Sequence, residues 1–218
     1  MKIDSAEYII SALHARQFLR DGLPEIAFVG RSNVGKSSLL NRLLNRKKLA
    51  RTGSTPGRTR AVNYFAITRP TAPRRFYFVD LPGYGFAKAS KSERQRWAEL
   101  MGQYFRDGQS SIEGPVNRRC LVQLVDAKVG ATVLDVEGYD YFHEVGHRPV
   151  VVATKIDKLP RGRRAKQLKA IRQQLQMADD EIVPISAVTG EGIQELWKKL
   201  LQFLDGQQMT PQRSAERR

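Results

Sequence analysis

Short apolar runs alternate along the chain with longer stretches in which apolar residues recur at helical spacing. The short runs have the length of buried strands and cover residues 25–29, 62–67, 76–79, 120–126, 149–153 and 181–185. The helical stretches cover residues 38–44, 92–105, 133–145 and 163–177, followed by a closing helix that bears Leu196, Leu200 and Phe203. At 218 residues, the chain is long enough for one well-filled α/β domain.

The second and third of these runs are joined by a direct Pro- and Arg-rich turn. That connection predicts an antiparallel pair of strands within an otherwise parallel sheet. Residues 1–23 carry an apolar cluster without visible chemistry, and we expect a short extension packed on the domain. Residues 24–205 form the expected nucleotide-binding domain, and residues 206–218 are polar and basic without periodicity, as in a disordered tail.

A glycine-rich segment between the first apolar run and the first helix carries a phosphate-binding pattern. Residues 30–37 read Gly-Arg-Ser-Asn-Val-Gly-Lys-Ser, and the flanking strand and helix argue against a chance glycine-rich turn. Backbone N–H groups there can bind phosphate, while Gly30 and Gly35 keep the approach open or supply the backbone angles. Lys36 is expected to reach the β- and γ-phosphates, and the Ser37 hydroxyl to ligate Mg²⁺. The predicted nucleotide contacts are Gly30, Arg31, Ser32, Asn33, Val34, Gly35, Lys36, Ser37 and Ser38.

The basic segment 46–60 follows the first helix. It contains two glycines, one proline and no acidic residue, and it is longer than the roughly 2–6 residues of a plain connector. We interpret it as a mobile loop that is ordered by the triphosphate and loosened after hydrolysis. Thr59 is the best candidate for a second side-chain ligand to Mg²⁺, and Thr55 is the alternative.

The strand at 76–79 runs into Asp80-Leu81-Pro82-Gly83. A carboxylate at the end of an apolar strand suits the Mg²⁺ shell, through a water molecule, and the N–H of Gly83 can reach the γ-phosphate. Asp80, Leu81, Pro82 and Gly83 are therefore predicted contacts, and the irregular segment 84–90 is predicted to be a second switch.

The strand at 149–153 ends in a motif that selects a base. Asp157 can accept hydrogen bonds from N1–H and the exocyclic N2–H₂ of guanine, whereas adenine offers neither donor in that arrangement. The Lys155 stem can lie along the base, and the backbone at 186–188 can bond the guanine O6. The predicted base contacts are Thr154, Lys155, Ile156, Asp157, Ser186, Ala187 and Val188.

The net charge of the chain indicates a negatively charged binding partner. Lysine and arginine number 37 against 22 acidic residues, a formal net charge of +15. Nucleic acid is the favoured partner, an anionic membrane surface comes second, and a merely basic protein is the remaining alternative. Residues 42–60 and 158–172 carry the basic runs expected to meet RNA, and neither run contains an acidic residue.

The composition argues against a reactive cysteine, a Cys/His metal site and a membrane span. The single cysteine, Cys120, lies in an apolar run and predicts a buried structural thiol, and three scattered histidines leave no Cys/His metal cluster. No apolar stretch approaches the roughly 18 residues of a membrane span. The N-terminus lacks a signal-peptide pattern, so a cytoplasmic location is expected.

The five motifs stand in the order and spacing of a small Ras-like GTPase, over roughly residues 24–204. Thr-Pro-Gly-Arg-Thr at 55–59 and Asp-Leu-Pro-Gly-Tyr-Gly at 80–85 resemble the bacterial EngB family, within the TrmE–Era–EngA group. The resemblance implies a three-layer αβα Ras-like P-loop fold whose six-stranded sheet has one antiparallel edge strand. It also implies a catalytic set of Lys36, Thr59 and Gly83. Further implied nucleotide contacts are Gly57, Arg58, Thr59, Arg60 and Ala61.

In function, the resemblance implies that GTP is hydrolysed to GDP and phosphate with Mg²⁺, as a switch in large ribosomal subunit assembly. The implied partners are the large-subunit precursor and its ribosomal RNA. A monomer is expected. A need in cell division and septation is implied as well.

Two residues depart from the wider GTPase pattern. Thr154 stands where asparagine is usual, and its hydroxyl can replace only part of the bonding of an amide. Tyr84 stands where Ras-like enzymes place the glutamine that orients the attacking water, so slow intrinsic hydrolysis is expected. The missing group is expected to be K⁺, bound with help from Asn33, or else ribosomal RNA or protein.

Two other functional classes remain as alternatives. A P-loop kinase or ATPase would have to accept adenine, against which Asp157 argues. A purely structural nucleic-acid binder would bind GTP without turnover.

Overall fold

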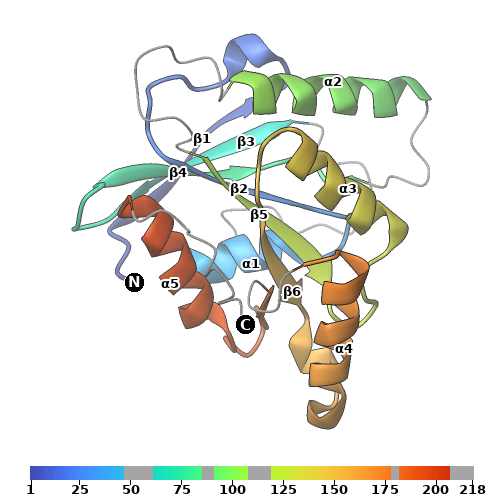
Figure 1. Cartoon of the computed structure of the whole chain (residues 1–218). Helices are drawn as coiled ribbons and strands as arrows, with labels where there is room; N and C mark the ends of the chain where they lie inside the picture. The colour runs from blue at the N-terminus through green and yellow to red at the C-terminus, as the bar shows by residue number, and fades with distance from the viewer. Residues whose placement is uncertain (47–60, 85–90, 108–118, 178–181, 207–218) are drawn as a thin grey trace, which may run out of the picture.

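The computed structural model describes residues 1–46, 61–84, 91–107, 119–177 and 182–206 (Figure 1). Seven strands are present in these ranges: β1 (Ser5–Ala12), β2 (Glu25–Gly30), β3 (Val62–Thr68), β4 (Arg75–Asp80), β5 (Arg119–Asp126), β6 (Val150–Thr154) and β7 (Ile182–Pro184). The α-helices are α1 (Lys36–Leu43), α2 (Lys91–Asp107), α3 (Val133–Glu144), α4 (Arg161–Gln174) and α5 (Ile193–Leu204). Two short 3₁₀ helices, η1 (Ala15–Gln17) and η2 (Ile156–Lys158), complete the described elements.

All seven strands form one sheet in the order β1-β3-β4-β2-β5-β6-β7. Strands β4, β2, β5, β6 and β7 pair in parallel, and β3 is antiparallel to both β1 and β4. The antiparallel pair predicted from the direct turn is therefore confirmed, and so is the mostly parallel sheet. Parallel strands need crossover connections, which the helices between β2, β5, β6 and β7 help to provide.

The expectation of six strands with an antiparallel edge strand is wrong in two details. The sheet has a seventh strand, β1, and β1 rather than the antiparallel β3 lies at that edge. The N-terminal segment shows a weak strand pattern because its fully or nearly buried positions are the small residues Ala6 and Ala12, while Tyr8 and Ile9 stay exposed. A register shift between Tyr8 and Ile10 further interrupts the alternation of the two faces.

Helices cover both faces of the sheet, which confirms the three-layer arrangement (Figure 1). On one face, α1 and α5 pack on apolar side chains of the central strands, including Ile26, Phe28 and Phe78. On the other face, α2 and α3 pack on Ala27, Val29 and neighbouring side chains, and α4 packs with α3 on β5 and β6. The central strands are apolar at successive positions because both of their faces are buried.

Cys120 lies in β5 and is buried, as predicted for a structural thiol. Burial raises the pKa of its thiol to about 12, so the reactive thiolate is disfavoured at neutral pH. Across the described part of the chain, no helix is both long and apolar enough to cross a bilayer.

Candidate nucleotide-binding site

The predicted motifs meet at one edge of the sheet, where the parallel strands end. β2 ends at Gly30, β4 at Asp80 and β6 at Thr154, and β5 between them ends at Asp126. In open α/β sheets, ligands bind at this carboxyl edge. The order of the strands therefore brings together motifs that lie far apart in the sequence.

The phosphate-binding loop leads from β2 into α1, whose first residues are Lys36, Ser37 and Ser38. Gly35 precedes the helix with φ 106°, a left-handed conformation that favours glycine, so the backbone reason given for this residue fits. Glycine is needed at position 30 for a different reason. A Cβ there would lie 2.9 Å from the Leu124 carbonyl oxygen, so glycine is required by close packing against β5.

Lys36 lies across the loop against the end of β4. Its Nζ donates hydrogen bonds to Asp80 Oδ1 and to the carbonyl oxygen of Leu81. The side chains of Lys36 and Asp80 are only 10% and 7% exposed. The structure thus places the lysine predicted to hold phosphates beside the carboxylate predicted to serve Mg²⁺.

The residues after β4 pack directly on the phosphate loop. A Cβ on Gly83 would lie 2.8 Å from the carbonyl oxygen of Gly30, and Arg31 forms an isolated parallel bridge with Tyr84. Leu81 and Pro82 are buried, and the indole Nε1 of Trp97 donates to the Pro82 carbonyl oxygen at 3.0 Å. Glycine at 83 therefore permits the closest approach of the two motifs.

Tyr84 points its hydroxyl into the protein interior. It donates to Asp135 Oδ1 at 3.2 Å and accepts from Gln123 Nε2 at 3.0 Å. Arg31 Nε donates to the other carboxylate oxygen of Asp135 at 2.9 Å. Burial, reinforced by the negative charge of Asp135, raises the pKa of Tyr84, so the residue remains a neutral phenol. The hydroxyl is thus engaged by Asp135 and Gln123, and the expectation that Tyr84 does not orient a water molecule stays a prediction.

The motif that follows β6 is tied to the phosphate loop by two side chains. Thr154 Oγ1 donates to the Val34 carbonyl oxygen at 2.6 Å. Lys155 has φ 58°, and its Nζ donates to the Asn33 carbonyl oxygen and to Asp126 Oδ2, both at 2.7 Å. The threonine hydroxyl thus forms a bridge to the loop in place of an amide.

Sequence reasoning missed Asp126, which anchors Lys155. The available signal was a carboxylate at the end of an apolar strand, the same signal that identified Asp80. Asp135 was missed as well, because it acts inside the fold and follows no phosphate-binding pattern.

The predicted base-binding segments lie side by side. The Ile156 N–H donates to the Ile185 carbonyl oxygen at 3.1 Å, joining η2 to the turn after β7. Asp157 lies in η2 with its side chain 17% exposed, and Lys158 Nζ is 3.8 Å from its Oδ2. In the adjoining turn, Ser186 is buried, Ala187 is partly buried and Val188 is 78% exposed.

Part of the predicted site lies outside the residues that the structure describes. Gly57, Arg58, Thr59 and Arg60 belong to this part, as does Thr55, so the choice between the two threonines stays a prediction. Ala61 is described and is buried immediately before β3. Segment 85–90, the rest of the predicted second switch, is also outside the described residues.

The described donors fit a hard cation shared with phosphate. The Ser37 hydroxyl and the Asp80 carboxylate both offer oxygen, which Mg²⁺ prefers. Within the described ranges no group of three or more His, Cys, Asp or Glu residues could hold a metal by itself. An ion at this edge would therefore take its remaining ligands from phosphates, water or residues outside the described ranges.

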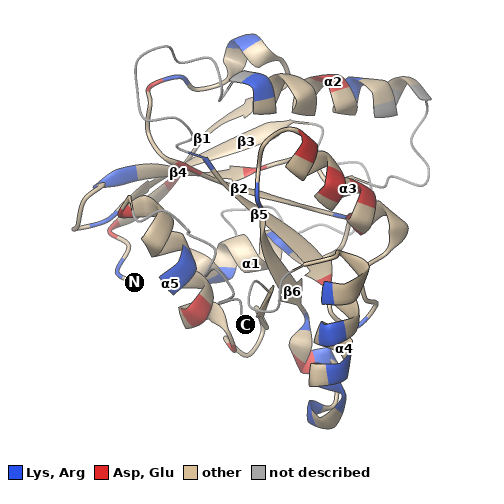
Figure 2. Cartoon of the chain, in the orientation of Figure 1, with Lys and Arg blue, Asp and Glu red and all other residues tan. Residues whose placement is uncertain are grey.

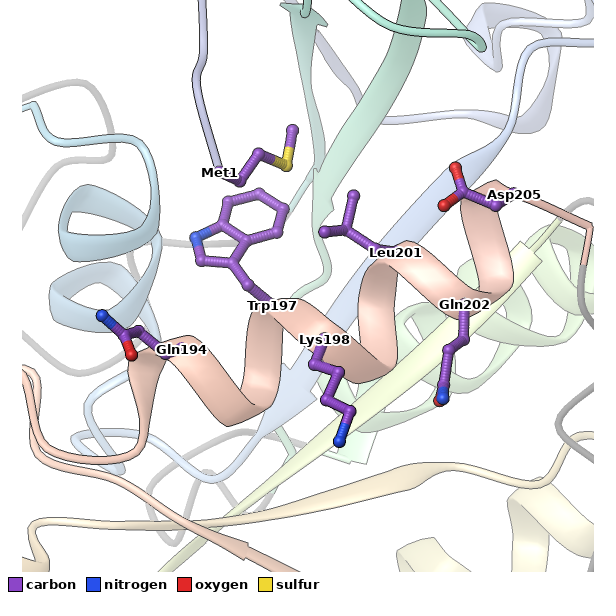
Figure 3. A pocket seen from close by; sticks show the side chains of 7 residues that line it. All are labelled: Met1, Gln194, Trp197, Lys198, Leu201, Gln202 and Asp205. Carbon is purple, nitrogen blue, oxygen red and sulfur yellow. The ribbon is translucent and has the colours of Figure 1, made fainter.

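A separate hollow of about 400 Å³ lies along α5 (Figure 3). Its lining consists of Met1, Gln194, Trp197, Lys198, Leu201, Gln202 and Asp205. None of these residues belongs to a predicted nucleotide motif.

Comparisons with known proteins agree with this arrangement. A family model described as "50S ribosome-binding GTPase" matches residues 25–155. A relative from Clostridioides difficile (strain 630), described as "Probable GTP-binding protein EngB", is 42% identical over 202 residues, covering 92% of this chain and 94% of that protein.

Solved structures show the same fold. The chain matches a crystal structure of a probable GTP-binding protein EngB with a TM-score of 0.63 and 26% identity, over 84% of this chain and 99% of that one. It also matches Era in complex with MgGDPNP and nucleotides 1506–1542 of 16S ribosomal RNA, with a TM-score of 0.64 and 28% identity, over 84% of this chain and 57% of that one.

Proposed function

Since this chain belongs to the EngB family of GTP-binding proteins, within the 50S ribosome-binding GTPases, we propose that it uses GTP hydrolysis as a molecular switch during assembly of the large ribosomal subunit. It acts in the cytoplasm, as a monomer, and is needed for normal cell division and septation. The proposal rests on one observation: two segments far apart in the sequence contact the phosphate loop from different strands. Thr154 and Lys155 donate to the Val34 and Asn33 carbonyl oxygens of the loop, and Gly83 packs against Gly30 at its start.

In the proposed complex, Lys36 leaves Asp80 and holds the β- and γ-phosphates. The N–H groups of the loop and of Gly83 bind phosphate oxygens, and the ammonium of Lys36 stabilises the charge that develops during transfer. Ser37, Thr59 and, through water, Asp80 would hold Mg²⁺, which would neutralise phosphate charge. The γ-phosphoryl group passes to water, leaving GDP and phosphate.

Guanine selection is assigned to Asp157. Its carboxylate lies in a short helix fixed by Ile156, which is buried, and by the bond from Ile156 to Ile185. Because the neighbouring turn at 186–188 is held beside it, a guanine ring can meet Asp157 on one edge and the backbone at its O6. Competition between GTP and ATP tests this assignment, and equal displacement of bound GDP by the two would contradict it.

Intrinsic hydrolysis is proposed to be slow, because the phenol of Tyr84 is bonded to Asp135 and Gln123. Asn33 would help to hold K⁺, which would supply the missing positive charge. Turnover measured in KCl and NaCl at equal ionic strength tests this role of K⁺. Identical rates would remove it and leave ribosomal RNA or protein as the source of the missing group.

The proposed RNA contact lies on α4. This helix has no acidic residue, and its exposed cations are Arg161, Arg163, Lys166 and Lys169 (Figure 2). A further cation, Arg164, pairs with Glu191 at 2.7 Å. A one-signed helix face suits a row of RNA phosphates, and Era, a related protein, has been solved with ribosomal RNA. The basic run at 42–60 is the second proposed contact.

Co-sedimentation with purified large ribosomal subunits tests the partner. The full chain is compared with GTP analogue, with GDP and without nucleotide, over a series of salt concentrations. Lys166→Glu on α4 should weaken binding and lower its salt dependence, whereas Lys198→Glu, an exposed charge on α5, is the matched control. Equal loss in both variants would contradict a contact on α4.

A further inference from the structure

Three polar residues occupy directly opposed positions on neighbouring strands. Ser11 of β1 pairs with Asn63 of β3, and Asn63 in turn pairs with Asp80 of β4. Opposed residues in a sheet project from the same face, so the three side chains form a row that leads from the edge strand to the phosphate loop. With Tyr8, which bonds to Ser11, we call this row the polar ladder.

The hydrogen bonds of the polar ladder share one direction. The Tyr8 hydroxyl donates to Ser11 Oγ at 2.8 Å, and Ser11 Oγ donates to Asn63 Oδ1 at 2.5 Å. Because the amide oxygen of Asn63 accepts from Ser11, its NH₂ group faces Asp80 and lies 3.5 Å from Oδ2. Successive donors thus point toward the carboxylate, and bonds aligned in this way strengthen one another.

Asp80 has two oxygens with different partners. Oδ1 accepts from Lys36, and Oδ2 faces the amide of Asn63. If Lys36 turned to the phosphates as proposed, Oδ1 would be free to serve the proposed Mg²⁺ shell, whereas the Asn63 contact does not involve the lysine. The chemistry of asparagine suits this position, since one side chain offers both the acceptor for Ser11 and the donor for Asp80.

We propose that Asn63 is a positioning residue, which β1 holds through Ser11 and which fixes the Asp80 carboxylate for its role at Mg²⁺. The inference rests on the proposed role of Asp80 in the Mg²⁺ shell. It gives the N-terminal strand a part in nucleotide binding. A purely structural ladder would join β1 to the sheet and alter stability alone, whereas a positioning ladder also sets the Mg²⁺ concentration that retains nucleotide.

The test measures release of fluorescent GDP from the full-length chain as free Mg²⁺ is varied. Asn63→Ala should raise the Mg²⁺ concentration for half-maximal retention by roughly tenfold, as for loss of a hydrogen bond to a charged group. Release in excess chelator should stay within about twofold, because Asn63 contacts Asp80 rather than the phosphate loop. Asn63→Leu, which keeps a similar size, should behave like Asn63→Ala.

A matched pair at Ser11 separates positioning from folding. Ser11→Ala removes the bond that orients Asn63 and should raise the Mg²⁺ midpoint by roughly threefold, whereas Ser11→Thr keeps the hydroxyl and should restore it. Thermal unfolding of each variant verifies the fold. The inference is overturned if Asp80→Asn moves the Mg²⁺ midpoint while both Asn63 variants and Ser11→Ala match the parent. If Asp80→Asn itself has no effect, the proposed role of Asp80 fails, and the inference fails with it.

Discussion

Replacement of Asp135 by alanine should cost more stability than any other single change at the phosphate-loop side of α3. Its carboxylate is 0% exposed and accepts from Arg31 Nε at 2.9 Å, from the N–H and Oγ1 of Thr132 at 2.9 and 2.8 Å, and from the Tyr84 hydroxyl at 3.2 Å. One side chain therefore joins the phosphate loop, the start of α3 and the residue after Gly83.

The expected loss of unfolding free energy is the sum of the bonds that the partners of Asp135 lose. Loss of the capping bonds at Thr132 costs about 1 kcal/mol, and the unmet hydroxyl of Tyr84 costs about the same. Arg31 is 22% exposed, so solvent screens its lost pairing, and we assign it about 1–2 kcal/mol rather than the larger cost of a fully buried pair. The Asp135→Ala variant should thus lose about 3–4 kcal/mol of unfolding free energy.

Urea unfolding at pH 7 measures this loss. Tyr84→Phe is the control, since it removes one hydroxyl and leaves the bond from Gln123 Nε2 to the Asp135 carbonyl oxygen, so it should cost about 1 kcal/mol. GDP should also dissociate faster from Asp135→Ala, because Arg31 belongs to the phosphate loop. A loss below about 1 kcal/mol, or one equal to that of Tyr84→Phe, would refute the central role of this carboxylate.

Three further predictions concern single positions. Gly30→Ala should lower the free energy of unfolding by about 1–3 kcal/mol, measured by urea titration, because its Cβ would meet a fixed backbone oxygen; an unchanged midpoint would contradict this reason. Thr154→Val removes the hydroxyl that donates to the Val34 carbonyl oxygen at 2.6 Å, and it should weaken GDP binding measured by calorimetry. Thr154→Ser keeps a hydroxyl and should keep the affinity for GDP. Equal loss of affinity in both variants would show that the hydroxyl does not matter for binding. Burial lowers the pKa of His147 to about 4, so the unfolded chain binds more protons between about pH 4 and 6.5, and stability falls as pH falls through that window. The parent should lose about 2 kcal/mol more than His147→Phe between pH 7 and 5 in urea titrations at each pH, and parallel losses would contradict the shift.

The positions of most elements could be predicted because the sheet is buried on both faces. The six predicted strands occur within two residues of their expected bounds, since short, β-branched apolar runs such as that of β6 are typical of strands buried on both faces. β1 was not predicted as a strand, because alanines occupy its fully or nearly buried positions and a bulge breaks its alternation. An edge strand with one exposed face carries too little apolar pattern to be distinguished from an extension.

In the candidate site, too, some residues could be predicted from the sequence and others could not. The loop, the end of β4 and the motif after β6 were predicted as contacts because phosphate, metal and base each demand particular residues at fixed spacing, and the fold brings these segments to one edge of the sheet. Asn63 and Asp135 were not found, because their partners are other side chains rather than a ligand. Arg31 and Asp135 are separated by 104 positions, and only the tertiary fold brings them together.

These tertiary contacts imply that the phosphate loop does not hold its shape alone. Asn33 and Gly35 both have positive φ, which asparagine tolerates better than most residues, and Asn33 has further support from its surroundings. Lys155 supplies it by bonding the Asn33 carbonyl oxygen, and Thr154 bonds the next carbonyl along the chain. Since the same motif continues into the proposed guanine contact at Asp157, base binding and phosphate binding share one rigid connection. A change at Thr154 or Lys155 should therefore weaken binding of guanosine nucleotides through the phosphates as well as through the base.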